Sequence, residues 1–421
     1  MVRLRQVARR APSVIDRWDF FQPGPNSAGA RSAWSRSFSI SISTLDLAAK
    51  TAMPGRLDTL TGMRFVAALP IVFLHVGSSF FGWTSLRAAF GYGYIGVSFF
   101  FVLSGFVLTW STAGIPARRF WWLRFARIWP AQALVAALVF VFLMQGRPPD
   151  WPGRAADFLL VQSWWPSSDV YFGGNGVSWS LSCEAFFYVV FPALAIGIRR
   201  LDHRGLAAVG AGLLAMLAIA PAVGEWWGLA QHLKYWLFFI LPGYRLLEFV
   251  LGMILARAVQ CGLRVPHPML TAAISAMVLA GLVSVLVWAS SNYGWNPSRP
   301  WVAMLALPVF ASLVLTGATA DIVGVASWLT SRPLQWLGAT SFALYLVHQP
   351  LFRITQTWGW WPARNDLAGL AAFAAFVALA LAVAGLLHHL VEKPLERRLR
   401  AMRVGLGTMA YSTAVPRRQA A

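Results

Sequence analysis

The feature that most constrains this chain is a series of apolar segments that begins after residue 60 and continues almost to the C-terminus. Each segment is about 17–25 residues long, the length with which an α-helix crosses the hydrocarbon core of a bilayer. Inside that core every backbone group must be hydrogen-bonded by the protein itself, which favours helices. We therefore predict an all-α fold, a polytopic transmembrane helix bundle with about ten spans. The expected spans are 64–82, 93–110, 129–145, 177–198, 206–222, 236–256, 268–289, 301–318, 334–354 and 367–391.

The composition agrees with a membrane protein. Charged residues make up 12% of the chain and hydrophobic residues 58%, whereas a soluble domain carries about 25% charged residues. This excludes a conventional soluble enzyme and a disordered protein. The two cysteines, Cys183 and Cys261, cannot form a disulfide scaffold. Neither a metal-binding HExxH motif nor a phosphate-binding GxxxxGK[ST] loop occurs in the sequence, so no metal cofactor is expected.

The positive charge also fits a bilayer better than a nucleic acid. The formal net charge is +20, which in a soluble chain would suggest nucleic-acid binding. Here the arginines gather in the tails and in alternate gaps between apolar segments, as the positive-inside rule describes. Both termini are therefore expected in the cytoplasm. The cytoplasmic gaps and the C-terminal tail contain Arg118, Arg119, Arg124 and Arg127, then Arg199, Arg200 and Arg204, then Arg257 and Arg264, then Arg332, and finally Lys393, Arg397, Arg398, Arg400 and Arg403.

Three regions are expected along the chain. Residues 1–54 are basic and rich in Ser, Pro and Gly, without the apolar core and cleavage site of a signal peptide, so we predict a disordered cytoplasmic tail there. Translation is expected to start at Met1 or at Met53. Residues 55–400 form the transmembrane domain, and 401–421 a short cytoplasmic tail. The longest outer loop, 146–176, is rich in Trp and Pro and either caps the outer face or forms an aromatic belt at the membrane interface.

Ionisable side chains within the spans are the first candidates for function, because they are costly in a membrane. Arg64 and His75 are eleven positions apart, so they share one helix face about 16 Å apart along the axis. Glu184, near the outer start of its span, is expected at a depth comparable to that of His75. An imidazole and a carboxylate that meet there would form a base and its orienting partner. The alternative is an interfacial arginine and structural hydrogen bonds between helices.

Two arginines near the cytoplasmic surface form a second candidate. Arg124 and Arg127 lie at i and i+3 on one helix face. Planar guanidinium groups in that position bind phosphates bidentately, although topology and lipid headgroups are an equally good explanation.

The ninth and sixth spans provide two further groups. Ser341, Tyr345 and His348 form one polar stripe, with His348 expected near His75 in depth. Arg245 and Glu248, at i and i+3, form either part of a site or a neutralising intrahelical pair.

Together these residues resemble the acyltransferase-3 family of integral-membrane acyltransferases over roughly residues 55–400. The matching motifs are, in chain order, RLDTLTGMRFVAA (56–68), Arg64 followed after ten residues by His75, GVSFFFVLSGF (96–106), Arg124-x-x-Arg127-x-x-Pro130, WSLSCEAFFY (179–188), SFALYLVH (341–348) and Glu392-Lys393-Pro394. Ala185 departs from the pattern, since relatives often have a second acid there. The chain resembles the stand-alone form, without the C-terminal esterase-like domain of some relatives.

The resemblance implies an enzyme in a bacterial inner membrane that moves a short acyl group, with acetyl expected, from acyl-CoA. The acceptor would be a hydroxyl of an envelope carbohydrate, a glycolipid or a secreted natural product. His75 and Glu184 would be catalytic. Acyl-CoA would bind to Arg64, Arg124 and Arg127, and the acceptor to Tyr345, His348, Arg245 and Ser180.

A second function class remains open from the residues alone. A proton-coupled secondary transporter could use His75, Glu184 and Arg245 as a proton relay or as a substrate site. Paired halves with matching interrupted helices, which mark many transporters, are not visible in the sequence, and the basic cytoplasmic cluster would then have no explanation.

Overall fold

A computed structural model describes residues 55–80, 84–143, 151–360 and 367–402. The predicted tail 1–54 and nearly all of the predicted tail 401–421 lie outside these residues. Across the described ranges the chain is helical and contains no strand.

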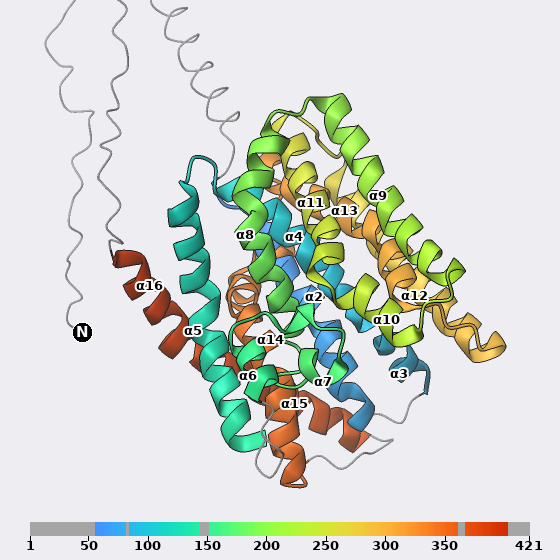
Figure 1. Ribbon diagram of the computed structural model, residues 1–421, viewed down its shortest axis with the longest axis vertical. Helices are drawn as coiled ribbons and strands as arrows, with labels where there is room; N and C mark the ends of the chain where they lie inside the picture. Colours follow the sequence, from blue (N-terminus) through green and yellow to red (C-terminus); the bar gives the residue numbers. More distant parts are fainter. Residues whose placement is uncertain (1–54, 81–83, 144–150, 361–366, 403–421) are drawn as a thin grey trace, which may run out of the picture. The chain divides into compact units, whose positions relative to one another are not determined.

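Each predicted span is found as a long helix, so the all-α polytopic bundle is confirmed (Figure 1). In the described part, nine of these helices are long and apolar enough to cross a membrane. The tenth, α14, is equally long but less apolar. The long helices are α2 (Asp58–Val76), α4 (Ile95–Ser111), α5 (Ala117–Leu143), α8 (Trp179–Arg199), α9 (His203–Trp226), α11 (Pro242–Gln260), α12 (Pro268–Tyr293), α13 (Arg299–Val323), α14 (Arg332–Thr357) and α15 (Leu367–Leu387).

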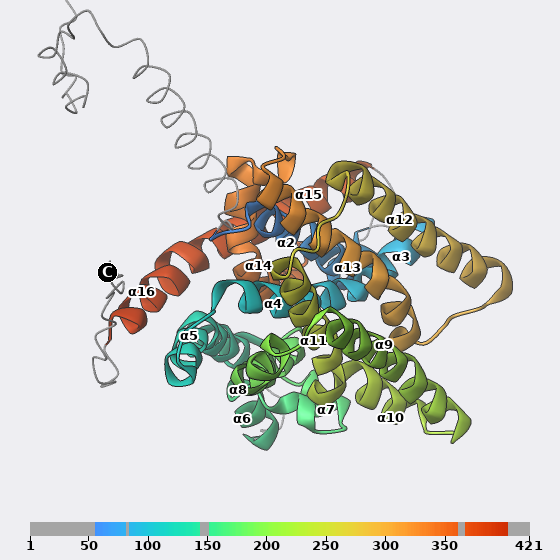
Figure 2. The ribbon, with the colours of Figure 1, turned by 90° about the horizontal axis from the view of Figure 1, so that it is seen from above.

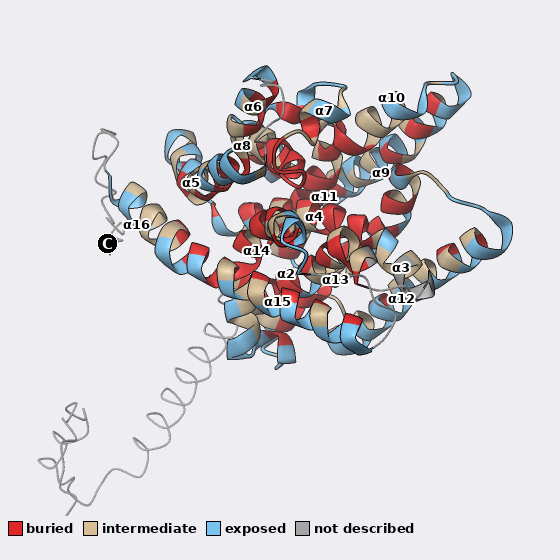
Figure 3. Ribbon diagram, turned by 90° about the horizontal axis from the view of Figure 1, so that it is seen from below, coloured by how far each residue is buried: buried red, intermediate tan, exposed pale blue. Residues whose placement is uncertain are grey.

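The bundle has a protein-surrounded centre and a lipid-exposed periphery. Seen from above, α2, α4, α11, α13 and α14 lie in the middle, with α5, α9, α12 and α15 around them (Figure 2). Buried residues concentrate in the same central helices (Figure 3). The apolar stretch containing α4 is 78% buried and that of α12 only 11%. A helix shielded from lipid does not need an apolar surface, which explains why α14 can carry a polar stripe.

Close helix contact in the centre depends on glycine. A Cβ atom at Gly105 of α4 would clash with the carbonyl oxygen of Phe249, and one at Gly252 of α11 with that of Val102. Small residues allow such backbones to approach when lipid gives no hydrophobic drive for helix association. The α4–α11 contact is thus specified by a glycine on each helix.

Several helices differ from the predicted bounds by a few residues; α2, for example, begins at Asp58 rather than at 64. Two differences matter for the site. α5 begins at Ala117 rather than at 129 and continues through Pro130, so Arg124 and Arg127 lie within the helix itself. After α15 the chain forms a π-helical turn, η6 (His388–Glu392), and then a short helix, α16 (Lys393–Ala401).

The outer loop, described from residue 151, folds into the short helices α6 (Trp151–Phe158), η3 (Gln162–Trp164) and α7 (Ser168–Tyr171). We call this segment, 151–178, the cap. Its Asn175 amide donates a hydrogen bond of 2.9 Å to the carbonyl oxygen of Leu346 in α14, while Trp151, Trp164 and Trp165 stay exposed. The segment therefore covers one end of the bundle and also presents tryptophans outward. We call the end of the bundle that this segment covers the cap end. We call the opposite end of the bundle, where α5 starts, the arginine end.

Candidate active site

The three arginines predicted to bind a donor lie around one cavity. Arg64 from α2 and Arg124 and Arg127 from α5 line it together with Glu184 and Tyr188 from α8. It encloses about 570 Å³ of empty space. The Nε atoms of Arg64 and Arg124 are buried without a hydrogen-bond partner among the described residues. Arg64 and Arg124 have Glu184 as the one carboxylate among the residues that line this space, the arginine cavity. The cavity therefore has an excess of donors and positive charge suited to an anion.

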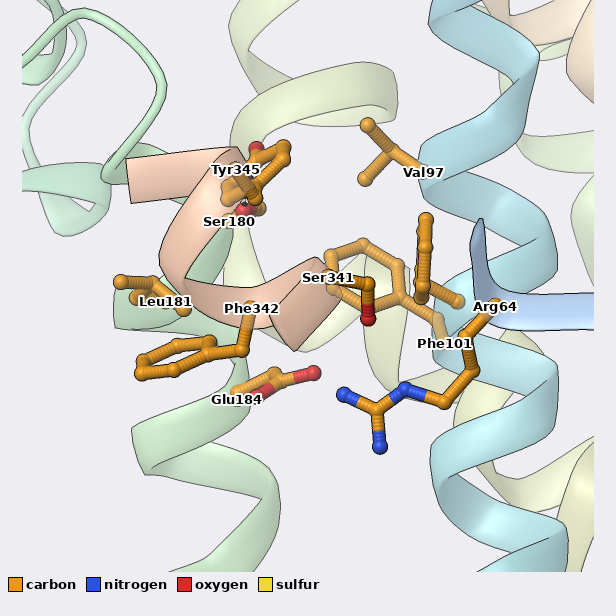
Figure 4. A pocket seen from close by; sticks show the side chains of 10 residues that line it. Arg64, Val97, Phe101, Ser180, Leu181, Glu184, Ser341, Phe342 and Tyr345 are labelled. Atoms are coloured by element: carbon orange, nitrogen blue, oxygen red, sulfur yellow. Dashed lines mark hydrogen bonds between the residues drawn. The ribbon is translucent and has the colours of Figure 1, made fainter. Parts of the chain in front are cut away.

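A second cavity adjoins the first toward the cap end. It encloses about 470 Å³ and shares Arg64, Phe100, Glu184 and Phe342 with the arginine cavity. Figure 4 shows Glu184 and Arg64 pointing toward one another across this inner cavity, with Ser180 and Tyr345 close together at its other end. Aromatic and aliphatic side chains form the rest of the wall, among them Val97, Phe101 and Leu181.

Glu184 lies beside the arginines of the cavity and not beside His75. Its Oε2 atom accepts a hydrogen bond of 3.1 Å from the Tyr188 hydroxyl. The expected contact between His75 and Glu184 is wrong. The prediction counted depth from the membrane surface, but α8 begins inside the bundle because residues 174–178 ahead of it are already buried. Glu184 consequently lies near Arg64, which is about 16 Å along α2 from His75.

His75 instead meets His348. Its Nδ1 atom lies 3.0 Å from His348 Nε2, which confirms that the two rings share one depth. His348 is fully buried, and its Nδ1 atom lies 3.2 Å from the carbonyl oxygen of Leu344. Helices α14 and α2 can approach each other because Gly338 of α14 has no Cβ atom. A Cβ atom there would clash with the carbonyl oxygen of Thr61 in α2.

Tyr345 connects the inner cavity to the histidine pair. Its hydroxyl donates to the carbonyl oxygen of Val177 at 2.9 Å and lies 2.7 Å from the Ser180 hydroxyl. The ring centroids of Tyr345 and His348 are 5.9 Å apart. The structure thus brings together Ser180, Tyr345 and His348, three of the residues predicted to hold an acceptor.

Arg245, the fourth of those residues, lies behind the cavity wall. Its side chain is 1% exposed, bonds Glu248 at 2.7 Å and Ser98 at 3.1 Å, and lies over the rings of Phe101 and Phe239. This is the neutralising pair that the sequence left open as an alternative. Such a pair satisfies the buried charge of each partner.

The sequence analysis missed the anchor of Arg127. Arg127 forms an ion pair with Glu392 of η6 and a second one with Glu396 of α16, at 3.1 Å. The Glu392 carboxylate, 2% exposed, also contacts His388 Nδ1 at 3.0 Å. The signal was present in the Glu392-Lys393-Pro394 motif, to which the sequence analysis assigned no contact. We call this set of contacts the Arg127 clasp.

The partner of Glu184 was missed as well. Tyr188 follows Glu184 by four residues, and i, i+4 side chains meet on a helix. The spacing was therefore visible in the WSLSCEAFFY motif.

A separate polar group holds the cap together. The Asp157 carboxylate is buried and accepts hydrogen bonds from the Ser178 hydroxyl and, at 3.1 Å, from the Gln162 amide. Burial raises the pKa of Asp157 to about 6, against the opposing effect of the hydrogen bond from Ser178.

Comparison with known proteins finds one matching family and several acyltransferases. A family described as an acyltransferase domain matches residues 57–389. The acyltransferase MdmB of Streptomyces mycarofaciens is 33% identical over 372 residues, which cover 82% of this chain and 92% of that protein. The peptidoglycan O-acetyltransferase OatA of Listeria monocytogenes is 26% identical over 71% of this chain, and the putative peptidoglycan O-acetyltransferase YrhL of Bacillus subtilis 28% over 72%. The chain spans about half the length of these two peptidoglycan relatives. No solved structure matches it.

Proposed function

This chain belongs to the acyltransferase-3 family, and from that premise we propose that it moves a short acyl group, acetyl in the first instance, from acyl-CoA to a hydroxyl group. The observation that carries the proposal is the order of the site along the bundle. Three arginines open into a cavity, an inner cavity follows, and Tyr345 then leads to the His75–His348 pair. A nucleotide-bearing thioester that enters at the arginine end matches this order.

The donor would be held by charge at one end and by hydrogen bonds in the middle. Coenzyme A is strongly anionic, and the guanidinium groups of Arg64, Arg124 and Arg127 are suited to its phosphates. The pantetheine arm carries two amides, whose N–H groups would donate to the Glu184 carboxylate and to the Tyr188 hydroxyl oxygen in the arginine cavity. The roughly 16 Å from Arg64 to His75 fits an extended arm.

His75 would be the general base. Its Nε2 atom takes the proton of the acceptor hydroxyl while the hydroxyl oxygen attacks the thioester carbonyl carbon. The carbon–sulfur bond then breaks, and the sulfur leaves with the proton from His75. In a two-step variant, His75 Nε2 attacks the thioester carbon, the carbon–sulfur bond breaks and coenzyme A leaves as its thiolate. The acceptor hydroxyl oxygen then attacks the acyl carbon, the carbon–nitrogen bond to His75 breaks, and the hydroxyl proton goes to the thiolate. Either route requires the Tyr345 side chain to turn aside so that a reactant reaches the histidine pair.

The acceptor would arrive from the cap end. The names of OatA and YrhL point to peptidoglycan hydroxyls as their acceptors, which favours an envelope carbohydrate or glycolipid here. The name of MdmB states no acceptor, so a secreted natural product stays the second candidate. The arginine distribution supports a cap end that lies outside the cytoplasmic membrane of a bacterium.

Replacing His75 tests the proposal. H75A should abolish acyl transfer, measured by mass spectrometry of surface glycans and secreted metabolites, while membrane insertion and coenzyme A binding stay unchanged. H203A is the matched control, since His203 is exposed at the start of α9. Normal product formation by H75A would reject His75 as the base.

Coenzyme A binding separates an acyltransferase from a proton-coupled transporter. Purified protein should bind coenzyme A, and R124A/R127A should weaken binding at least tenfold, with a smaller dependence on salt. R118A/R119A is the control, since Arg118 and Arg119 are exposed on the same helix. Binding that is absent, or equally weakened by both double variants, would contradict the donor site.

A further inference from the structure

We infer that His348 is a positioning residue that keeps the proton of His75 on Nδ1 and so leaves the lone pair on Nε2. The inference rests on the proposed function, because it assigns His348 a role in preparing the base. It also changes the expected role of His348, which the sequence placed among residues that hold the acceptor.

The argument starts from a backbone carbonyl group, which can only accept a hydrogen bond. Leu344 O lies 3.2 Å from His348 Nδ1, so this nitrogen must carry a proton. In a neutral imidazole the other nitrogen then has a lone pair, and His348 Nε2 is an acceptor. His75 Nδ1, 3.0 Å away, must therefore be the donor. His75 Nε2 is left unprotonated, which is the state a general base requires.

The surroundings support neutral rings in the resting protein. His348 is 0% exposed, and among the described residues neither ring hydrogen-bonds to a carboxylate. A charged His348 would be buried without a counter-ion, which is costly. A single chain of donation, from His75 to His348 to Leu344, satisfies three of the four ring nitrogens without any charge.

The same contact also serves the charged state of His75 during catalysis. Once Nε2 has taken the acceptor proton, the Nδ1–H of the imidazolium donates a charge-assisted hydrogen bond to His348 Nε2. His348 thereby takes the part that the sequence analysis assigned to Glu184. It can do so with precision because its own ring is held by Leu344 within α14, and because α14 approaches α2 closely at Gly338.

Nuclear magnetic resonance reads the proton position directly. The protein would be labelled with ¹⁵N-histidine in lipid nanodiscs, and the His75 signals identified by their loss in H75A. We expect a protonated Nδ1 and an unprotonated Nε2 in the wild type. In H348L the carbonyl of Ile71 is the acceptor left beside the His75 ring, so the proton should shift in part to Nε2. In H348Q, whose amide oxygen can still accept, the wild-type pattern should return in part.

Kinetics provides the second readout. H348L should lower kcat by about 100-fold or more, as a misplaced imidazole proton does elsewhere, with the KM for acyl-CoA within about twofold. H348Q should recover part of kcat. Unchanged coenzyme A binding by both variants would show that they fold. A purely structural role would instead change KM, kcat and stability together and show no rescue by glutamine.

The inference fails if wild-type His75 carries its proton on Nε2 or on both nitrogens, or if H348L leaves both the proton position and kcat unchanged. The resonance experiment needs no substrate. It can therefore succeed even if H75A still transfers acyl groups, an outcome that would reject the proposed function alone.

Discussion

At the scale of single residues, function depends on which partner each ionisable group meets. His75 and Glu184 have side chains suited to form a base and its carboxylate partner, but His75 meets His348, and Glu184 faces Arg64 and meets Tyr188. Each pairing has a different chemical result. An imidazole acceptor controls a proton position, whereas a carboxylate among arginines limits the positive charge of a binding cavity.

Glu184 should therefore affect donor binding more than chemistry. E184A removes a carboxylate that we propose accepts a hydrogen bond from the pantetheine arm, a contact worth about 1 kcal/mol. The KM for acyl-CoA should rise about fivefold, with kcat within about twofold. E184Q, which keeps an acceptor oxygen, should lie between wild type and E184A. A large loss of kcat at unchanged KM would return Glu184 to the role of partner of the base.

At the scale of elements, a short C-terminal segment supports the donor site. The π-helical turn η6 directs Glu392 toward Arg127 in α5, and the Trp122 indole donates a hydrogen bond of 2.7 Å to the carbonyl oxygen of Leu399 in α16. Turns of this kind often occur at functional sites, since they redirect a side chain within a helix. The segment thus fixes an arginine that lies far from it in the sequence.

Breaking the Arg127 clasp should loosen the arginine cavity. E392Q leaves part of the Arg127 charge without its buried partner, so we expect a several-fold higher KM for acyl-CoA and a lower melting temperature in detergent. E396Q is the control: Glu396 is more exposed and is shared with Arg400, so its loss should have less effect. Equal effects of both variants, or none from E392Q, would show that the clasp does not position Arg127.

The cap should respond to pH through Asp157. Burial raises its pKa to about 6 in the folded cap, above the usual value of about 3.9. Ionisation of Asp157 therefore lowers the stability of the folded cap. This loss of stability is fully present above pH 6 and disappears as the pH falls toward 4. The folded cap should be more stable at low pH than at high pH by about 3 kcal/mol at most. Hydrogen exchange within 151–178, corrected for intrinsic rates, should show a tighter cap at pH 5 than at pH 7.5.

The control for the cap is D157N, which cannot ionise. Its cap should show the same protection at both pH values. Faster exchange in the wild-type cap at pH 5 than at pH 7.5 would contradict the predicted direction of the pH dependence.

At the scale of the whole domain, residues 55–402, burial separates the helices that build the site from those that face lipid. Helices α2, α4, α5, α8 and α14 line the two cavities or hold the histidine pair, while α9 and α12, the least buried of the candidate spans, carry none of these residues. In the proposed function the donor reaches the site from the arginine end and the acceptor from the cap end, so the membrane orientation decides which reactant reaches which end.

Cysteine labelling would determine that orientation. In a C261S background, with Cys183 buried, Ser168 in the cap and Ala113 before α5 are exposed sites for a single cysteine. A membrane-impermeant maleimide should label S168C in intact spheroplasts, and A113C only after lysis. The opposite pattern would put the arginine end outside and exclude cytoplasmic acyl-CoA as the donor.

The sequence by itself determined the elements. Span length, arginine placement and helical spacing were enough for the ten helices, the shared face of Arg64 and His75, and the grouping of Arg124 with Arg127. These are local properties, because a helix has fixed rise and rotation per residue.

Only the tertiary structure decided the partners. The rotation of each helix about its axis, and the depth at which it begins, depend on packing between distant segments, such as Gly338 against Thr61 or Glu392 against Arg127. The buried stretch ahead of α8 shifted Glu184 away from His75, and the approach of α14 to α2 supplied His348 instead. Spacing along one helix cannot reveal either, since neither the rotation nor the starting depth is encoded within that helix alone.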